Sequence, residues 1–215
     1  AAVAGAVAQE ILACYEQPGI DRAWVNNGGD IALHLAPGQS VTVGVYADIA
    51  ALNAAQLRHG LVLDGQIRID SDMPVRGVAT SGWRGRSQSL GIADSVTVLA
   101  RTAAQADAAA TIVANAVDVA DARIVRRPAW QVRDDSDLGA IPVTVDVPAL
   151  PRELVARALH QGLQKAQELQ SSGLLWFALL ACQGQWVATS APQTLANAVW
   201  PRNAVAESEV GSVFA

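Results

Sequence analysis

The chain has 215 residues, 51% of them apolar and only 5% aromatic, with a formal net charge of -5. This apolar content argues against a disordered chain, and the acidic balance without any Lys/Arg run argues against a nucleic-acid partner. The longest apolar run, residues 174–182, has nine residues, whereas a membrane span needs roughly 20, so we expect no membrane partner.

The predicted elements mix helices and strands. In chain order, helices are predicted over residues 1–16, 102–117 and 151–170. Strands are predicted over residues 22–26, 31–35, 41–46, 61–69, 75–81, 95–100 and 141–147, and residues 174–181 and 186–189 complete the core. Residues 83–91 and 121–140 are polar and indicate irregular loops. Because no regular βαβ rhythm is present, the order favours an α+β fold with a layered mixed or antiparallel sheet and packed helices.

The segment boundaries predict one domain over residues 1–190 and a C-terminal tail over residues 191–215. The sequence opens at Ala1 inside a helical pattern, so we expect an N-terminal part to be missing from it. Cys14 and Cys182 lack the spacing of a zinc or redox site, and we expect two reduced, buried thiols in a cytoplasmic protein.

Asn26-Asn27-Gly28-Gly29-Asp30 lies between two predicted strands. Paired glycines let a backbone turn through positive φ and approach a ligand closely, while the flanking amides and the carboxylate add donors and acceptors. Asn-Gly is also a strong signal for an ordinary hairpin turn. The motif alone therefore leaves a ligand-binding turn and a plain hairpin as alternatives.

A second polar group follows the strand predicted over residues 75–81. Thr80 and Ser81 end this strand, and Arg84 and Arg86 follow them. Hydroxyl and guanidinium groups together suit the recognition of a phosphate or a carboxylate. The alternative is a solvated loop without a ligand.

Asp107 and Thr111 are four residues apart on a predicted helix, which places both side chains on one face. A carboxylate and a hydroxyl are hard oxygen ligands of the kind that Mg²⁺ prefers. The alternative is an Asp that complements the helix dipole beside a packed Thr. Residues 134–137 are likewise interpreted either as a cation site or as a solvated acidic loop. The histidines do not cluster into a metal or catalytic pattern.

In order along the chain, five motifs resemble those of the ApbE-like superfamily, whose best-known members are Mg²⁺-dependent FAD:protein FMN transferases. The family motifs are A-K-G, N-x-G-G-[DE], A-[TS]-S-G, a valine-rich strand and A-D-A-x-[AS]-T. The corresponding segments here are Val3-Ala4-Gly5 and residues 26–30, 79–82, 95–98 and 106–111. The resemblance implies an ApbE-like, T-fold-like architecture.

The resemblance also implies site residues. It implies that Asp107 and Thr111 bind Mg²⁺, with a weaker indication for the backbone carbonyl of Val3. It implies that FAD, FMN or another nucleotide binds in a pocket. Together with the motif chemistry, the predicted cofactor-binding residues are Asn26, Gly28, Gly29, Asp30, Thr80, Ser81 and Arg84.

Two departures from the family pattern concern the chemistry. Flavin transferases carry H-x-x-D-P-x-T-G before the valine-rich strand, whereas residues 87–94 here read SQSLGIAD, without histidine or proline. The lysine of A-K-G is Ala4. The chain is more similar to a shorter, uncharacterised bacterial and archaeal branch that shares S-x-S-x-G-x-A-D-x-V-T-V and D-S-D-L-G. The catalytic residues are therefore unassigned, with Asp94 and Arg86 as candidates.

Three functions follow as hypotheses. The first is a cofactor-handling protein with a nucleotide-like or flavin-like pocket, possible Mg²⁺ dependence and chemistry other than FMN transfer. The second is a non-catalytic binding or assembly protein that reuses the fold, with a homodimer as a possible form. The third is an FAD:protein FMN transferase, although that reaction needs a group to activate the incoming hydroxyl.

Overall fold

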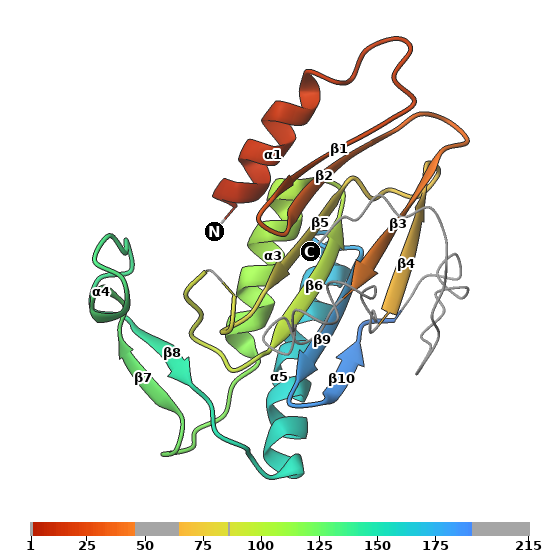
Figure 1. The fold of residues 1–215 in the computed structure, drawn as a ribbon. Helices are drawn as coiled ribbons and strands as arrows, with labels where there is room; N and C mark the ends of the chain where they lie inside the picture. The colour runs from red at the N-terminus through yellow and green to blue at the C-terminus, as the bar shows by residue number, and fades with distance from the viewer. Residues whose placement is uncertain (1, 46–64, 86, 191–215) are drawn as a thin grey trace, which may run out of the picture.

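The computed structural model describes residues 2–45, 65–85 and 87–190 (Figure 1). Its helices are α1 (Val3–Ala13), α3 (Ala103–Ala116), α4 (Ala129–Val132) and α5 (Arg152–Ser171). Its strands are β1 (Arg22–Asn27), β2 (Asp30–Leu35), β3 (Ser40–Val45), β4 (Gly65–Asp70), β5 (Gly77–Ser81), β6 (Ser95–Ala100), β7 (Val125–Pro128), β8 (Pro142–Asp146), β9 (Phe177–Cys182) and β10 (Gln185–Ala188). Within these described ranges, no helix combines the length and the apolar character that a membrane crossing requires.

Six strands form one sheet in the order β1-β2-β5-β6-β9-β10. All strand pairs in the described part of the chain are antiparallel. The predicted α+β class is therefore confirmed, with the antiparallel form of the sheet. The likeness to an ApbE-like or T-fold-like architecture stays a prediction. The boundary between a domain and a tail also stays a prediction, because residues 191–215 lie outside the described residues.

Helices α1, α3 and α5 pack on one face of this sheet (Figure 1). Successive side chains of a strand point to opposite faces, so Val78 and Ala79 of β5 enter two different cores. Ala79 shares its core with Ala106, Ala110 and Val113 of α3. Small side chains at these positions let the helix lie close to the sheet, which is how a chain with few aromatic residues fills its interior.

The β3–β4 hairpin supplies the second core, on the other face of the sheet. Ile67 and Ile69 of β4 are buried in one cluster with Ile31 and Leu33 of β2. Part of the strand predicted over residues 61–69 lies outside the described residues. Within the described residues this strand is β4, which begins at Gly65.

Most of the remaining predicted elements are confirmed with shifts of one to three residues at their ends. The helix predicted over residues 102–117 is α3, and Thr102 is its N-cap. The Thr102 Oγ1 atom accepts a hydrogen bond from the Gln105 N–H at 3.2 Å.

The largest difference from the sequence prediction lies in residues 121–140, which were expected to be irregular. They contain β7 and α4, and β7 pairs with β8 in a two-stranded ribbon. We call residues 125–146 the arm; it extends away from the main sheet (Figure 1). No side chain of β7 is fully buried, so this strand shows none of the apolar alternation by which a strand is recognised.

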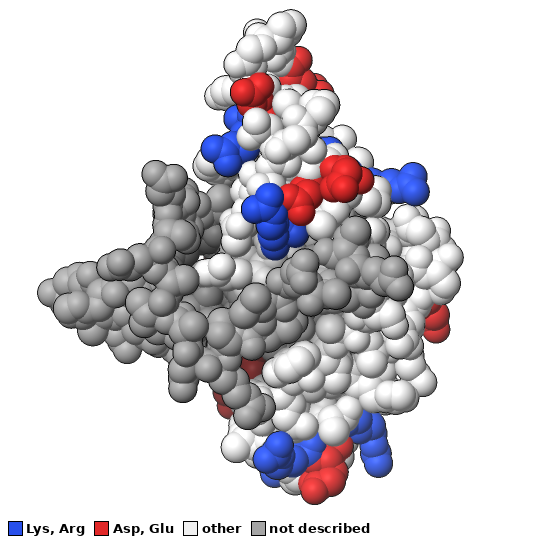
Figure 2. Space-filling model, turned by 90° about the vertical axis from the view of Figure 1, so that its right-hand side faces the viewer, with Lys and Arg blue, Asp and Glu red and all other residues white. Residues whose placement is uncertain are grey.

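Charged side chains of both signs lie beside one another on the face shown in Figure 2, in groups near its two ends. A nucleic-acid footprint requires a basic patch or stripe. The described residues on this face present mixed charge instead, and the absence of a nucleic-acid partner stays a prediction.

Candidate functional site

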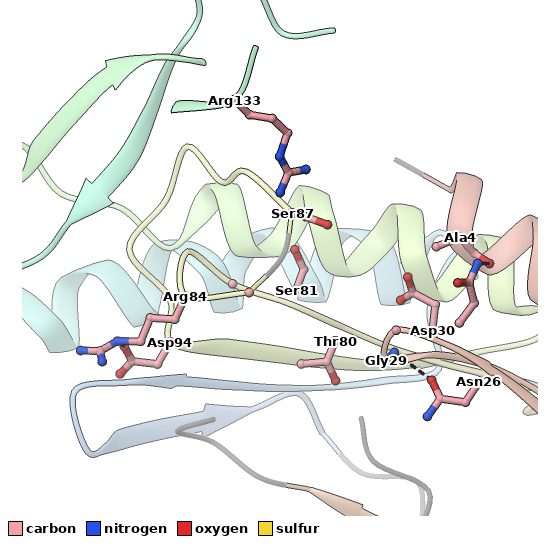
Figure 3. Close-up of a pocket in the computed structure, with 14 residues that line it drawn as sticks. Ala4, Asn26, Gly29, Asp30, Thr80, Ser81, Arg84, Ser87, Asp94 and Arg133 are labelled. Atoms are coloured by element: carbon pink, nitrogen blue, oxygen red, sulfur yellow. Dashed lines mark hydrogen bonds and ion pairs between the residues drawn. The ribbon is translucent and has the colours of Figure 1, made fainter. Parts of the chain in front are cut away.

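A cavity of about 880 Å³ opens at one end of the six-stranded sheet (Figure 3). Its volume falls within the range of roughly 300–1,000 Å³ that is typical of small-molecule sites. The lining residues are Ala4, Asn26, Asn27, Gly28, Gly29, Asp30, Thr80, Ser81, Gly82, Arg84, Gly85, Ser87, Asp94 and Arg133. All seven residues that the sequence predicted to bind a cofactor are among them, and so is Asp94. We call this cavity the pocket.

The β1–β2 turn forms one side of the pocket. Gly28 and Gly29 occupy its two central positions with φ of 72° and 111°, the left-handed region that a tight hairpin turn requires. The Asn26 side chain accepts a hydrogen bond from the Gly29 N–H at 2.8 Å, and the Asn27 side chain donates to the Ala4 carbonyl at 3.2 Å. The sequence left a hairpin turn and a ligand-binding turn as alternatives for residues 26–30. In the structure these residues form a hairpin turn and also line the pocket.

The end of β5 places two hydroxyl groups at the pocket. Thr80 and Ser81 are consecutive, so their side chains leave the strand on opposite faces. The Thr80 hydroxyl is held 3.0 Å from the Thr97 hydroxyl of β6. Each hydroxyl can both donate and accept a hydrogen bond, so these groups suit a polar ligand of either kind.

The loop between β5 and β6 brings Arg84 and Asp94 to the pocket because its two ends lie against each other. A Cβ on Gly82 would lie 2.4 Å from the Asp94 carbonyl oxygen, so only glycine fits at this position. The adjacent Trp83 N–H donates to the Ala93 carbonyl at 3.0 Å. The close approach of the two backbones therefore sets where both charged side chains begin.

The Asp94 carboxylate connects this loop to the β9–β10 turn. It accepts a hydrogen bond from the Gln183 N–H at 2.5 Å and pairs with Arg84 Nε at 3.2 Å. The Arg84 guanidinium also lies over the Trp83 ring, 4.8 Å from its centre. Asp94 thus has a clear structural role, and its proposed catalytic role stays a prediction. Arg86, the other catalytic candidate, lies outside the described residues.

The two cysteines differ in their surroundings. Burial, together with the nearby Asp94 carboxylate, raises the pKa of Cys182 to about 12. Its Sγ–H donates to the Ile92 carbonyl at 3.4 Å. Cys182 is buried as expected, but the expectation that Cys14 is buried was wrong, because this residue lies exposed just after α1.

Arg133 lines the pocket, although the sequence analysis did not single it out. It directly follows α4 in the arm, and its side chain extends toward Ser87 (Figure 3). Nothing in the local pattern predicts this approach. The feature of the sequence that could have marked Arg133 as a candidate is its position immediately before the acidic segment at residues 134–137. This stretch was expected to be irregular.

Asp107 and Thr111, the predicted metal ligands, do not line the pocket. Asp107 is buried where α1 meets α3, and its Oδ2 atom accepts the Gly5 N–H at 3.0 Å. Gly5 lies in the first turn of α1, whose N-cap position is Ala2 and lacks a side-chain cap. The carboxylate therefore stabilises the N-terminus of a different helix from its own. Whether Mg²⁺ also binds there stays a prediction.

The acidic segment at residues 134–137 lies on the protein surface, where Asp134, Asp135 and Asp137 are all exposed. No cluster of three or more His, Cys, Asp or Glu side chains suited to a metal occurs among the residues that the structure describes. His34 Nε2 lies 3.0 Å from the Ile20 carbonyl, which fits a structural hydrogen bond. His59 lies outside the described residues.

The fold and the site together define an α+β protein with a polar pocket at one end of its antiparallel sheet. A family model described as "AbpE bacteria" matches residues 1–188, and the chain belongs to that family.

Relatives of the chain include proteins of methanogenic archaea that bear the name UPF0280 protein. One from Methanospirillum hungatei is 36% identical over 122 residues, which is 56% of this chain and 46% of that protein. One from Methanopyrus kandleri is 38% identical over 137 residues, 63% of this chain and 49% of that protein. The chain thus spans about half the length of these relatives. Their name states no activity.

Proposed function

We propose that the pocket binds a small nucleotide-like or flavin-like molecule and that the protein handles this ligand in chemistry other than standard FMN transfer. The observation that carries the proposal is the convergence of the seven predicted cofactor-binding residues on one cavity. These residues come from two separate segments of the sequence, 26–30 and 80–84, so their meeting is a property of the fold and not of their spacing.

The lining chemistry supports a polar ligand with an anionic part. The Gly28-Gly29 turn, Thr80, Ser81, Arg84 and Arg133 all line the cavity, and together they carry backbone groups, hydroxyls and guanidinium groups. Guanidinium groups form strong, directional hydrogen bonds with phosphate and carboxylate oxygens. A cavity of about 880 Å³ is large enough for a nucleotide-sized molecule.

Transfer of FMN to a protein hydroxyl would require a general base. The segment over residues 87–94 offers no histidine. Its carboxylate, Asp94, already accepts the Gln183 N–H and pairs with Arg84. These contacts support a reaction other than FMN transfer, or binding alone.

Magnesium belongs to this proposal only as a possible cofactor. Asp107 and Thr111 would supply a carboxylate and a hydroxyl oxygen, and the first turn of α1 would supply backbone carbonyls such as that of Val3. Because the Asp107 carboxylate already accepts the Gly5 N–H, the donor set is incomplete without ligand oxygens or water.

Calorimetric titration with FAD, FMN and ADP, each with and without Mg²⁺, tests the proposal. We expect at least one of them to bind, and T80V to weaken that binding by about 3- to 10-fold through the loss of one hydrogen bond. T42V is the matched control, because Thr42 is exposed on β3 outside the pocket. If none of the three molecules binds under any of these conditions, the proposal fails.

An assembly protein is the second candidate, and the outer face of α1 favours it. Val3, Val7 and Ile11 lie one turn apart and are 72%, 44% and 47% exposed. These three apolar side chains give α1 an outer face that a second copy of this chain can cover. We propose a second copy of this chain as the occupant. Mass photometry should then show a dimer that V7E converts to a monomer, and a wild-type monomer would contradict the assignment.

A further inference from the structure

We propose that Arg133 recognises a phosphate group of the ligand, which binds between the Arg133 guanidinium and the side of the pocket that carries Ser81 and Ser87. This inference rests on the proposed function, since it assigns a chemical class to one end of the pocket's ligand. It makes the arm a part of the binding site.

We call the loop between β5 and β6 the pocket loop. Hydrogen bonds from both ends of the arm hold the arm against this loop. Gln88 Nε2 donates to the Ala129 carbonyl at 2.9 Å, and the Thr144 N–H donates to the Ser89 carbonyl at 2.8 Å. The Ser136 hydroxyl also donates to the Gln88 side chain. Because α4 lies between these contacts, the position of Arg133 is set by the same loop that carries Ser87.

The two arginines that line the pocket, Arg84 and Arg133, have different surroundings. Arg84 is paired with Asp94, whose side chain is only 11% exposed, and it also lies over the Trp83 ring. Arg84 is therefore held by contacts within its own loop. Arg133 reaches the pocket from the arm, and its guanidinium points toward Ser87 (Figure 3). A phosphate in this part of the pocket would face the Arg133 guanidinium and the Ser87 hydroxyl.

The two carboxylates that line the pocket, those of Asp30 and Asp94, lie away from Arg133, so the charge differs from one part of the pocket to another (Figure 3). Asp30 lies beside Ala4 and the β1–β2 turn, and Asp94 lies beside Arg84 (Figure 3). A phosphate is repelled from both carboxylates and attracted toward Arg133. The Asp30 side is left to hydroxyl or amine donors of the same ligand. A phosphate ester of a polyhydroxyl or heterocyclic compound matches both ends.

The test compares ligands that differ only in the phosphate. FMN and riboflavin share the ring system and the ribityl chain, and ADP and adenosine form a second pair. We expect the wild-type protein to bind the phosphorylated member at least tenfold more tightly. R133Q should lower that affinity about tenfold and leave riboflavin or adenosine binding within about twofold. R133K, which keeps the charge without the planar fork, should fall between the two.

Arg127 provides the matched control, because it is exposed on β7 of the same arm and does not line the pocket. R127Q makes the same charge change and should bind every probe as the wild type does. If R133Q fails to fold, R133K and S87A decide, since both should reduce the preference for the phosphorylated probe.

The outcomes separate this inference from the proposed function. If the probes bind but R133Q keeps the wild-type preference for phosphate, the Arg133 assignment is wrong and the pocket remains a ligand site. The same holds if R133Q weakens both members of a pair equally, because that result indicates only a structural role for the arm. If no probe binds the wild type, the proposed function fails and this inference fails with it.

Discussion

The pocket and a Mg²⁺ site at Asp107 were both predicted from short polar motifs, but the fold uses the residues of these motifs in opposite ways. At the pocket, polar groups from separate segments face a cavity and are open to a ligand. At the α1–α3 contact, the polar group is turned inward, and Asp107 bonds to the Gly5 N–H. The difference teaches that a ligand-type residue indicates a site only when the backbone around it leaves space. Where two helices touch, the same carboxylate becomes part of the packing.

The largest expected effect in this comparison comes from G82A. The added Cβ would meet the Asp94 carbonyl oxygen at 2.4 Å, so the two ends of the pocket loop must separate. We expect the free energy of unfolding to fall by about 2–3 kcal/mol and ligand binding to be lost. Urea denaturation and calorimetry measure the two effects.

The matched control for G82A is G85A in the same loop. A Cβ on Gly85 would have its nearest neighbour at 3.2 Å, a contact that a small shift relieves. G85A should therefore be clearly less destabilising than G82A. Equal effects of the two variants would mean that the contact at Gly82 does not position the loop.

A smaller effect is expected for D107A at the α1–α3 contact. It removes the acceptor of a buried N–H at the start of α1, which costs about 1–3 kcal/mol in unfolding free energy. D107N keeps an acceptor but loses the charge that complements the helix N-terminus, so it should cost less. D134A, at an exposed carboxylate, should stay within about 0.5 kcal/mol of the wild type.

The same variants sharpen the question of Mg²⁺. If Asp107 serves packing alone, Mg²⁺ leaves the melting temperature of wild type and D107N unchanged. If the wild type gains stability with Mg²⁺ and D107N does not, the α1–α3 contact is also a metal site, and Asp107 serves a ligand as the pocket residues do.

The smallest expected effect concerns the two cysteines, each of which reports on one region. Cys14 follows α1 and is exposed, so it should react rapidly with Ellman's reagent at pH 8. Cys182 is buried beside Asp94 with its pKa raised to about 12, and it should react only after unfolding. C14S should remove the fast phase completely. A second fast thiol in the native protein would show that the sheet end beneath the pocket opens readily.

The raised pKa of Cys182 also predicts a pH dependence of stability. The folded state holds the thiol proton more strongly than the unfolded chain, whose cysteine has a pKa of about 9.0. The stabilisation is therefore complete below pH 9 and is lost as the pH rises from 9 toward 12. At pH 10 the loss should be on the order of 1 kcal/mol relative to C182A, which lacks the titrating group.

Much of the fold could be predicted from local pattern. The Thr102 cap, the apolar spacing of α5 and the Gly28-Gly29 turn each specify their element through interactions within a few residues. The arm could not be predicted in this way, because β7 buries none of its side chains and so carries no apolar alternation. The exposure of Cys14 also depends on which face of α1 meets the sheet, which its mostly apolar sequence does not specify.

The sequence by itself determined the α+β class and the set of residues that line one side of the pocket, since turn glycines, strand ends and caps act through short-range geometry. Only the tertiary structure decided which of the predicted polar residues share a space. It brought the turn at residues 26–30 to the end of β5 through strand pairing, and it brought Arg133 to the same cavity through the contacts of Gln88 and Thr144. It placed Asp107 outside that cavity, because the carboxylate of this α3 residue accepts the Gly5 N–H at the start of α1. These are long-range contacts, and no local pattern in the chain encodes them.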